Sequence, residues 1–278
     1  MKLSFSTLGA PDWSVDEILK YAREYGYDGV GFRGVKGQMD LTKIPEFLPE
    51  NRKATLKRFR DAGIDIMMML TGAKFVQKDK ADRDKNVADA KANIDLAADM
   101  DAKTIRIFGG AIPADVDKKV AYGWVVDCMK ASADYGAKKK IRVLLEVHDA
   151  FTDTFAVREV MERVNHPWAG VLWDVHHPYR TLGQTMKTAW DNVGKWTYDT
   201  HFKDSVVDKS DVKYGHRYTL MGEGDVPNIE ALQLLKDNGY KGYLTFEWEK
   251  AWHPALPDAH VAFPDYVKKM KAYLAKLK

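Results

Sequence analysis

The amino-acid sequence predicts an α/β fold, a single (β/α)8 TIM barrel. Its 278 residues suit this fold, which typically takes about 250 residues. Short apolar segments typical of strands alternate with segments typical of helices along the whole chain, eight times in all. No long low-complexity linker interrupts the alternation. We therefore expect one domain over residues 1–278.

Four strands are expected in the first half of the chain, each followed by a helix. The first helix has a clear start and end, because Ser14 and Glu17 form a capping box and Gly26 supplies the left-handed residue that ends many helices. Gly63 ends the second helix before a methionine-rich strand. The expected strands are Leu3–Leu8, Gly29–Arg33, Ile64–Leu70 and Thr104–Phe108. The later helices of this half cover about Asn51–Ala62, Arg83–Met100 and Asp115–Tyr135.

The second half repeats the alternation of strand and helix. Its expected strands are Ile141–Glu146, Gly170–Asp174, Thr197–His201 and Tyr243–Glu247. Its expected helices cover Thr154–Val164, Gln184–Val193, the segment between Pro227 and Gly239, and Pro264–Leu277. A doubly wound open sheet is the structural alternative. That fold normally has a glycine-rich phosphate-binding turn after its first strand, and Ser6–Pro11 is a poor match to one.

The composition argues against several classes of partner. A formal net charge of +3 is too small to indicate a nucleic-acid or membrane partner. No apolar run approaches the roughly 20 residues that span a bilayer, and we expect a cytoplasmic protein. The single cysteine, Cys128, lies in an apolar helical segment and is expected to be buried. Oligomeric state is left open, with a homo-oligomer as one alternative.

Residues able to bind a divalent metal stand at the ends of the last four expected strands. They are Glu146, Asp174, His201 and Glu247. The carboxyl ends of barrel strands meet at one rim, so these side chains are expected to lie together. Carboxylates brought together in a dry pocket repel one another, and a bound cation removes that penalty. Three carboxylates and one imidazole suit one Mn²⁺, Mg²⁺, Co²⁺ or catalytic Zn²⁺ ion.

Four further residues near these strand ends are candidates for binding substrate: His148, His177, Lys203 and Arg217. His177 and Arg217 are expected in loops, and alternation along the strand puts Lys203 on the same side as His201. Pairing of Lys203 with Asp204 or Asp208 is an equally good alternative. His176 is expected either to pack behind the site or to face it.

At these residues the chain is similar to the sugar phosphate isomerase/epimerase group of the xylose isomerase-like barrels. This group includes ketose 3-epimerases, inosose dehydratases and isomerases, and hydroxypyruvate isomerase. The similarity covers essentially the whole chain. It rests on Glu146, Asp174-x-x-His177, His201-x-Lys203-Asp204, Gly222-Glu223-Gly224-Asp225-Val226-Pro227 and Glu247-x-Glu249.

The resemblance implies a metal site and a reaction. It implies that Glu146, Asp174, His201 and Glu247 hold one catalytic divalent metal and that the two glutamates also act as the acid/base pair. It implies substrate contacts at the positions of His177 and Arg217. Two departures fall where the substrate is expected: Phe32-Arg33-Gly34 replaces a segment that carries an acidic residue in many members, and His148 is unusual after Glu146.

We therefore expect an enzyme that removes a proton next to the carbonyl of a keto-sugar or polyol ketone, through an enediolate stabilised by the metal. Epimerisation, aldose–ketose isomerisation and β-elimination share this first step. His148 could protonate a leaving group, so a lyase or dehydratase is the alternative. Two further alternatives are an endonuclease IV-like phosphodiesterase with several zinc ions and a barrel without catalytic activity.

Overall fold

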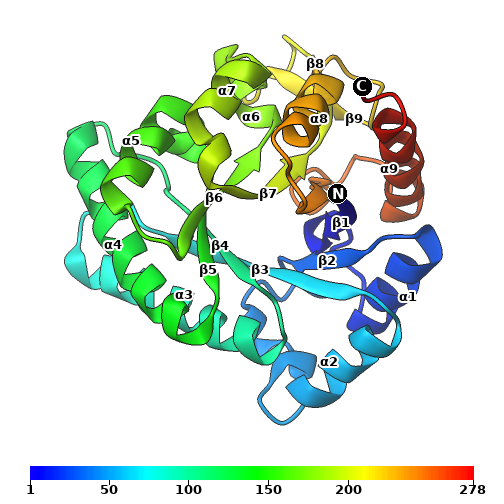
Figure 1. The fold of residues 1–278 in the computed structure, drawn as a ribbon, viewed down its shortest axis with the longest axis horizontal. Helices are drawn as coiled ribbons and strands as arrows, with labels where there is room; N and C mark the ends of the chain where they lie inside the picture. The colour runs from blue at the N-terminus through cyan, green and yellow to red at the C-terminus, as the bar shows by residue number, and fades with distance from the viewer.

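The computed structural model describes residues 1–278. Eight parallel strands close into a barrel in the order β1-β2-β3-β4-β5-β6-β7-β10, where β10 pairs again with β1 (Figure 1). The predicted (β/α)8 barrel is thus confirmed. The barrel strands are β1 (Lys2–Ser6), β2 (Gly29–Phe32), β3 (Asp65–Lys74), β4 (Thr104–Phe108), β5 (Arg142–Glu146), β6 (Ala169–Asp174), β7 (Thr197–Phe202) and β10 (Tyr243–Phe246).

Helices surround the barrel, as expected for parallel strands that must be covered on their outer face (Figure 1). They are α1 (Val15–Tyr25), α2 (Arg52–Asp61), α3 (Lys80–Asp99), α4 (Lys118–Lys139), α5 (Thr154–Val164), α6 (His176–Leu182), α7 (Met186–Val193), α8 (Asn228–Asp237) and α9 (Ala259–Leu274). The predicted capping box of Ser14 and Glu17 is present, and Gly26 adopts a left-handed φ of 81°. Cys128 is buried in α4, as expected.

The core has an outer layer and a small inner plug. A cluster of 69 buried apolar residues packs between the strands and the helices. A separate cluster of Met67, Met68, Leu70, Leu144 and Leu172 comes from β3, β5 and β6. Side chains alternate along a strand, so the residues two positions beyond Leu144 and Leu172 point into the same barrel interior. Those residues are Glu146 and Asp174, and the core thus fixes which side chains enter the mouth.

Three segments differ from the sequence prediction. Strand β8 (Asp204–Val207) pairs with β9 (His216–Thr219) in an antiparallel hairpin that the alternation pattern did not reveal. Helix α6 begins at His176, two residues after Asp174, where a loop was expected. The last helix begins at Ala259 and contains Pro264 in its interior rather than at its start.

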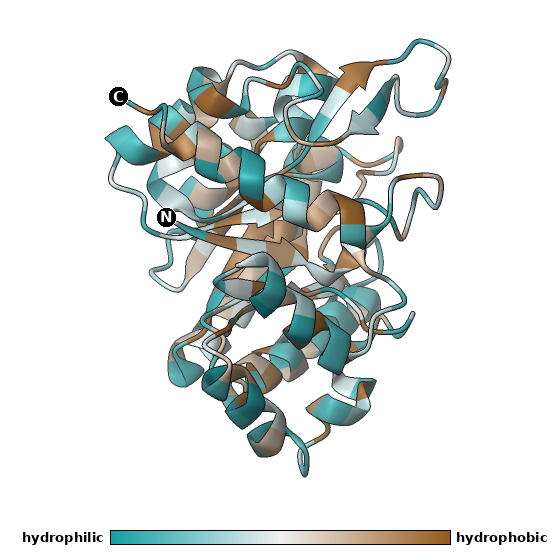
Figure 2. Ribbon diagram, turned by 90° about the vertical axis from the view of Figure 1, so that its right-hand side faces the viewer, coloured by the Kyte–Doolittle hydropathy of each residue, from teal (hydrophilic) through white to brown (hydrophobic).

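Hydropathy follows this architecture: in Figure 2 the strands at the centre are mostly brown and the surrounding helices are largely teal. No helix combines the length and the apolar character needed to cross a bilayer.

Candidate metal centre at the barrel mouth

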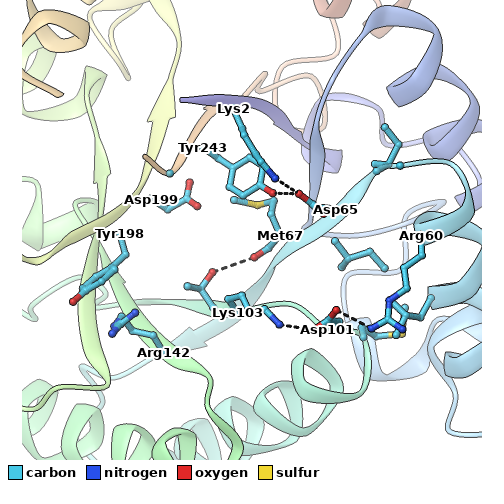
Figure 3. A pocket seen from close by; sticks show the side chains of 17 residues that line it. Lys2, Arg60, Asp65, Met67, Asp101, Lys103, Arg142, Tyr198, Asp199 and Tyr243 are labelled. Atoms are coloured by element: carbon cyan, nitrogen blue, oxygen red, sulfur yellow. Dashed lines mark hydrogen bonds and ion pairs between the residues drawn. The ribbon is translucent and has the colours of Figure 1, made fainter. Parts of the chain in front are cut away.

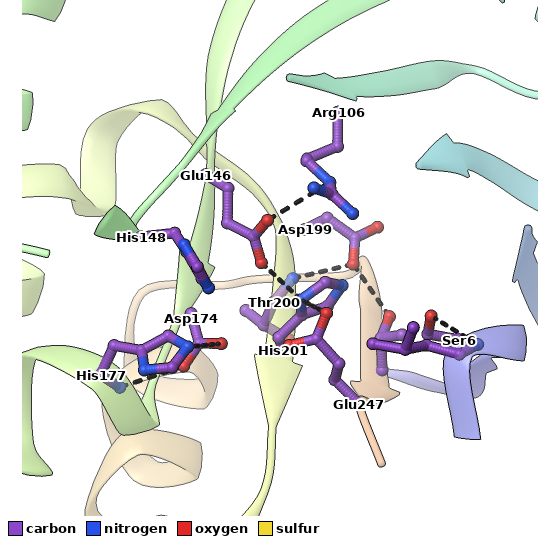
Figure 4. A network of polar contacts seen from close by, with 12 residues as sticks. Ser6, Arg106, Glu146, His148, Asp174, His177, Asp199, Thr200, His201 and Glu247 are labelled. Atoms are coloured by element: carbon purple, nitrogen blue, oxygen red, sulfur yellow. Dashed lines mark hydrogen bonds and ion pairs between the residues drawn. The ribbon is translucent and has the colours of Figure 1, made fainter. Parts of the chain in front are cut away.

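The four candidate metal ligands come together at the carboxyl ends of the strands (Figure 4). Glu146 ends β5, Asp174 ends β6, His201 lies in β7 and Glu247 directly follows β10. One ligand atom from each side chain lies within 4.8 Å of those of the other three, and all four residues are buried. Segments separated by about a hundred residues of sequence therefore form one cluster, because the closed barrel brings their ends to one rim.

The imidazole of His201 is held between the two glutamates. Its Nδ1 lies 2.8 Å from Glu146 Oε1 and 3.1 Å from Glu247 Oε1. Burial opposes a charge on this ring, but the charges of Glu247 and Glu146 outweigh burial and raise the pKa of His201 to about 10. The protein thus uses a cationic imidazole to balance carboxylates that would otherwise repel one another.

The residues present fit a divalent cation. His201 Nε2 is buried and has no polar partner in the protein, whereas Glu146 Oε2 and Asp174 Oδ2 meet Arg106 at 3.2 Å and Lys203 at 2.9 Å. Buried polar atoms are normally paired, so the unpaired ring nitrogen among three buried carboxylates indicates that the cluster serves a ligand. Carboxylate oxygens with a single imidazole form the hard, oxygen-rich set that suits Mn²⁺, Mg²⁺, Co²⁺ or a catalytic Zn²⁺.

Lys203 is completely buried and compensates further negative charge in the cluster. Its Nζ lies 2.9 Å from Asp174 Oδ2 and 3.0 Å from Glu249 Oε1, and it donates a short hydrogen bond to Glu247. Burial lowers the pKa of this amine, but the three carboxylates outweigh burial and raise it well above its usual value. The alternative pairing of Lys203 with Asp204 or Asp208 is wrong, because the chain turns Asp204 the other way.

Asp204 instead organises the glycine-rich segment singled out in the sequence. Its Oδ2 accepts the backbone N–H groups of Gly222 at 2.9 Å and Gly224 at 3.2 Å, and its Oδ1 accepts that of Val226 at 3.2 Å. A Cβ on Gly224 would lie 2.1 Å from Asp204 Oδ1, so only glycine allows this approach. The carboxylate thereby ties the chain that follows the β8–β9 hairpin to the barrel rim.

Asp174 also starts α6 and so places the two adjacent histidines. Its Oδ1 accepts the backbone N–H of His176 at 2.9 Å and that of His177 at 3.1 Å. His176 packs behind the site, fully buried, with Nε2 2.8 Å from Ser205 Oγ. His177 lies in the first turn of α6, not in a loop, and its Nε2 is 3.5 Å from Asp174 Oδ2.

A cavity of about 580 Å³ opens onto the cluster, and Glu247, Glu249, His148 and His177 line it. The rings of His148 and His177 meet edge to face with centroids 4.7 Å apart. Burial opposes a charge on His148, but Asp149, whose Oδ1 lies 3.1 Å from Nδ1, and the charge of Glu146 raise its pKa above the usual value.

Arg217 lies outside this cavity. It sits in β9 between His216 and Tyr218, which line the cavity, and alternation along the strand turns Arg217 to the opposite face. Its side chain is 64% exposed and its nearest acid, Asp208, is 3.9 Å away. The expected substrate contact of Arg217 assumed an irregular loop, and the unpredicted hairpin accounts for the difference.

Two cavity-lining arginines lie in positions that the sequence prediction did not assign. Arg106 lies in the middle of β4 with 1% exposure, and its Nε is 3.2 Å from Glu146 Oε2 (Figure 4). Arg33 follows β2 and lines the same cavity. A basic residue inside the apolar run Thr104–Phe108 is a signal that could have identified Arg106, since a strand covered on both faces is normally apolar throughout.

A second cavity, of about 570 Å³, lies at the opposite end of the barrel (Figure 3). Ion pairs stand at its rim, among them Lys2 with Asp65 at 2.6 Å and Arg60 with Asp101 at 2.8 Å. Barrel enzymes carry their chemistry at the carboxyl ends of the strands, and residues at the other end serve stability. The candidate site is therefore the mouth that contains Glu146.

Comparison with known proteins agrees with this fold. The family model described as xylose isomerase-like TIM barrel matches residues 19–271. Fructoselysine 3-epimerase of Shigella flexneri is 22% identical over 261 residues, which cover 89% of this chain and 90% of that protein.

Two solved structures illustrate the similarity of fold. The IOLI protein with a bound zinc atom superposes with a TM-score of 0.82 at 17% identity, covering 100% of this chain and 99% of that one. The probable 3-DHS dehydratase AsbF of Bacillus anthracis superposes with a TM-score of 0.79 at 18% identity, covering 98% and 99%.

Proposed function

Because this chain belongs to the xylose isomerase-like TIM barrel family, we propose that it is a divalent-metal-dependent sugar isomerase or epimerase. The substrate would be a keto-sugar or a related polyol ketone. The observation that carries the proposal is the buried cluster of Glu146, Asp174, His201 and Glu247 at the mouth of the barrel. The similarity to a 3-epimerase over most of the chain supports the same reaction class.

These four residues would hold the metal. A bound divalent cation would stabilise negative charge on the substrate oxygens as a Lewis acid. The buried His201 Nε2, which has no partner in the protein, supports this assignment, because the ring would become a ligand when a cation takes the place of its proton.

Glu146 and Glu247 are proposed as the acid/base pair. Burial raises a carboxyl pKa, but in Glu146 the charges of Arg106 and His201 together outweigh burial, and in Glu247 the charges of His201 and Lys203 together do. Both pKa values are therefore lowered, and both groups are ionised and able to accept a proton at neutral pH. One glutamate would take the proton from the carbon next to the carbonyl. Its return to the opposite face gives an epimer, and its return to the neighbouring carbon gives an isomer.

His148 and His177 are proposed to contact substrate, whereas Lys203, for which the same contact was expected, is fully buried and does not line the cavity. His148 and His177 line the cavity beside the cluster, and each ring has hydrogen-bonding capacity for a hydroxyl group. Lys203 lies deeper, between Asp174 and Glu249, where it can fix the orientation of both carboxylates. We place Arg217 outside this set, because it lies outside the cavity.

A lyase or dehydratase acting on a keto-sugar or keto-glycoside is the second candidate function. The observation that favours it is the position of His148, which lines the cavity with its Nδ1 3.1 Å from Asp149 Oδ1; Asp149 and Glu146 outweigh burial and raise the pKa of the ring. A protonated imidazole could deliver a proton to a leaving hydroxyl or alkoxide after the same first step. The fold similarity to a probable dehydratase is consistent with this alternative.

Solvent deuterium exchange tests the shared step. Keto-sugars are incubated with the Mn²⁺-loaded protein in D₂O, and NMR detects deuterium entering the carbon next to the carbonyl. Product analysis then separates epimer, isomer and eliminated product. Glu146→Gln should abolish the exchange, whereas Glu162→Gln on the outer surface of α5 should preserve it. Full exchange by the Glu146→Gln variant would refute the assigned role.

A further inference from the structure

The guanidinium group of Arg33 has no partner in the protein. It forms no ion pair and donates no hydrogen bond, and its Nη1 is buried. An unpaired buried charge is costly, so a site that retains one normally provides it for a ligand. Arg33 lines the cavity that opens onto Glu247 and His148, and this places the unpaired donors where a substrate would bind.

Arg106 presents a second set of unpaired donors to the same cavity. Its single ion pair joins Nε to Glu146 Oε2 at 3.2 Å, while Nη1 is buried and unpaired. The guanidinium lies 3.7 Å from the centre of the Phe108 ring, which fixes its plane. Packing against Phe108 and the ion pair with Glu146 therefore set the position of the Arg106 guanidinium, and its Nη1 stays free to bind a ligand.

The two arginines act on each other electrostatically. Burial and the charge of Arg106 lower the pKa of Arg33 to about 10, against the charges of Glu146 and Glu247, which raise it. This wall of the cavity thus carries two guanidinium groups, and Glu146 is the only carboxylate in ion-pair contact with them. An anion between the two guanidiniums would relieve the repulsion and satisfy the free N–H groups.

We propose that the substrate is a keto-sugar acid whose carboxylate is bound by Arg33 and Arg106. This inference rests on the proposed function, because it places the carboxylate beside the carbonyl carbons handled by Glu146 and Glu247. The reacting part of the substrate faces the acidic side of the cavity, and the carboxylate faces the basic side. Arg33 is then a specificity-determining residue for the reaction.

The charge balance favours a carboxylate over a phosphate ester. Arg106 is already paired with Glu146, so one buried positive charge, that of Arg33, lacks a counterion. A carboxylate supplies one negative charge and two oxygens that match a planar guanidinium. A phosphate monoester carries nearly two charges at neutral pH, and the second would approach the carboxylates of the metal cluster.

Isothermal titration calorimetry with matched sugars tests the proposal. D-Fructose and 2-keto-D-gluconate differ only at C1, which is a hydroxymethyl group in the first and a carboxylate in the second. L-Sorbose and 5-keto-D-gluconate form a second pair, in which the carboxylate lies at the end of the sugar chain far from the carbonyl. D-Fructose 1-phosphate is the phosphate arm. At least one keto acid should bind about tenfold or more tightly than its neutral partner, the effect of one charge-assisted contact.

Variants then locate the contact. Arg33→Gln should remove the preference for the acid and change binding of the neutral sugar little, and Arg33→Lys should restore part of it. Arg158→Gln, on the exposed face of α5, removes the same charge elsewhere and should change neither. Each of four results would overturn the proposal. The acid and the neutral sugar could bind equally in both pairs, or neither acid could bind at millimolar concentration. The phosphate could bind most tightly, or the preference for the acid could survive Arg33→Gln.

The two proposals fail separately. Deuterium exchange with a neutral ketose and no preference for acids would leave the isomerase assignment intact and reject the carboxylate site. A keto-acid preference that depends on Arg33, without exchange in any sugar, would support the carboxylate site and reject the assigned reaction.

Discussion

Lys203 Nζ lies 2.9 Å from Asp174 Oδ2, and neither side chain is accessible to solvent. The ammonium group also contacts Glu247 and Glu249, so a single cation compensates three buried carboxylates. Removal of one partner of such a buried ion pair destabilises a protein, because the other charge stays buried without compensation.

Substitution Lys203→Met should destabilise the metal-free protein by roughly 3 kcal/mol, because three carboxylates lose their counter-charge. A divalent cation should restore much of this loss, so Mn²⁺ should raise the melting temperature of the variant more than that of the wild type. Lys187→Met breaks a surface pair with Asp191 and should cost less than about 1 kcal/mol. Urea unfolding with and without Mn²⁺ measures the stability of both variants. An equal stabilisation by Mn²⁺ in Lys203→Met and in the wild type would contradict this account.

One divalent ion per chain is the expected stoichiometry, measured by elemental analysis after dialysis against Mn²⁺. Asp174→Asn should lower the occupancy at limiting metal at least about tenfold, because it removes a charged ligand. Asp191→Asn on the exposed face of α7 is the matched control and should bind like the wild type. Three ions per chain would favour the phosphodiesterase alternative, and none would favour a barrel without metal chemistry.

The four residues of the cluster could be predicted from the sequence, because the end of each strand is marked by a local pattern. An apolar run followed by Glu146 or Asp174 identifies the last residue of a buried strand, and barrel closure then brings such ends together. Helix α5 and strand β4 were predicted at the bounds that the structure shows. These elements have strong local signals.

Contacts that depend on the closed barrel were not predictable in the same way. Whether Arg106 enters the mouth depends on which strand face points inward, and the apolar residues around it do not distinguish the faces. The partners of Lys203 come from β6 and the segment after β10, far away in sequence. Arg217 was misplaced because β8 is a short strand whose pairing with β9 has no strong alternating pattern.

Arg33 should reduce the stability of the folded protein. Its guanidinium is partly buried without a partner, and retention of such a group implies selection for binding rather than for stability. Arg33→Met should therefore raise the free energy of unfolding by about 1 kcal/mol in urea titrations without ligand. Arg158→Met, at an exposed position on α5, should change it by less than about 0.5 kcal/mol. A loss of stability in Arg33→Met would show that the group has a structural partner.

Acid should destabilise the protein through His216. Burial lowers the pKa of this ring, and with the charges of Arg180 and Lys203 it outweighs the hydrogen bond to the Tyr214 carbonyl and the charge of Asp211, which raise the pKa. As the pH falls through about 6.5, the unfolded chain binds a proton at this histidine more readily than the folded protein does. The free energy of unfolding therefore falls with the pH over this window.

His216→Phe should reduce that dependence, because phenylalanine keeps the ring contact with Tyr218 and cannot be protonated. Urea unfolding at about pH 7.5 and pH 5.5 measures the difference. His260→Phe, at an exposed position in α9, is the control and should retain the pH dependence of the wild type. An unchanged pH dependence in His216→Phe would rule out this histidine as the source.

Gly109, directly after β4, leaves room for the side chain that supports the His148 segment. A Cβ on Gly109 would lie 2.0 Å from Phe151 Cδ2 and 2.3 Å from Cε2. Phe151 is fully buried at the end of a short 3₁₀ helix (Asp149–Phe151) that follows His148. Gly109→Ala must therefore displace Phe151, and we expect a loss of roughly 1–3 kcal/mol, the usual cost of overpacking a core.

A glycine in helix α4 provides the opposite case. A Cβ on Gly123 would meet only Arg163 Nη2, at 3.5 Å, and this is the end of a flexible side chain. Gly123→Ala should stabilise the protein by about 0.5–1 kcal/mol, because alanine loses less backbone entropy in a helix. Urea unfolding of the two variants compares the same chemical change in a crowded and an open position. A Gly109→Ala variant as stable as the wild type would contradict the predicted clash with Phe151, and a loss of stability in Gly123→Ala would contradict the expected gain in the open position.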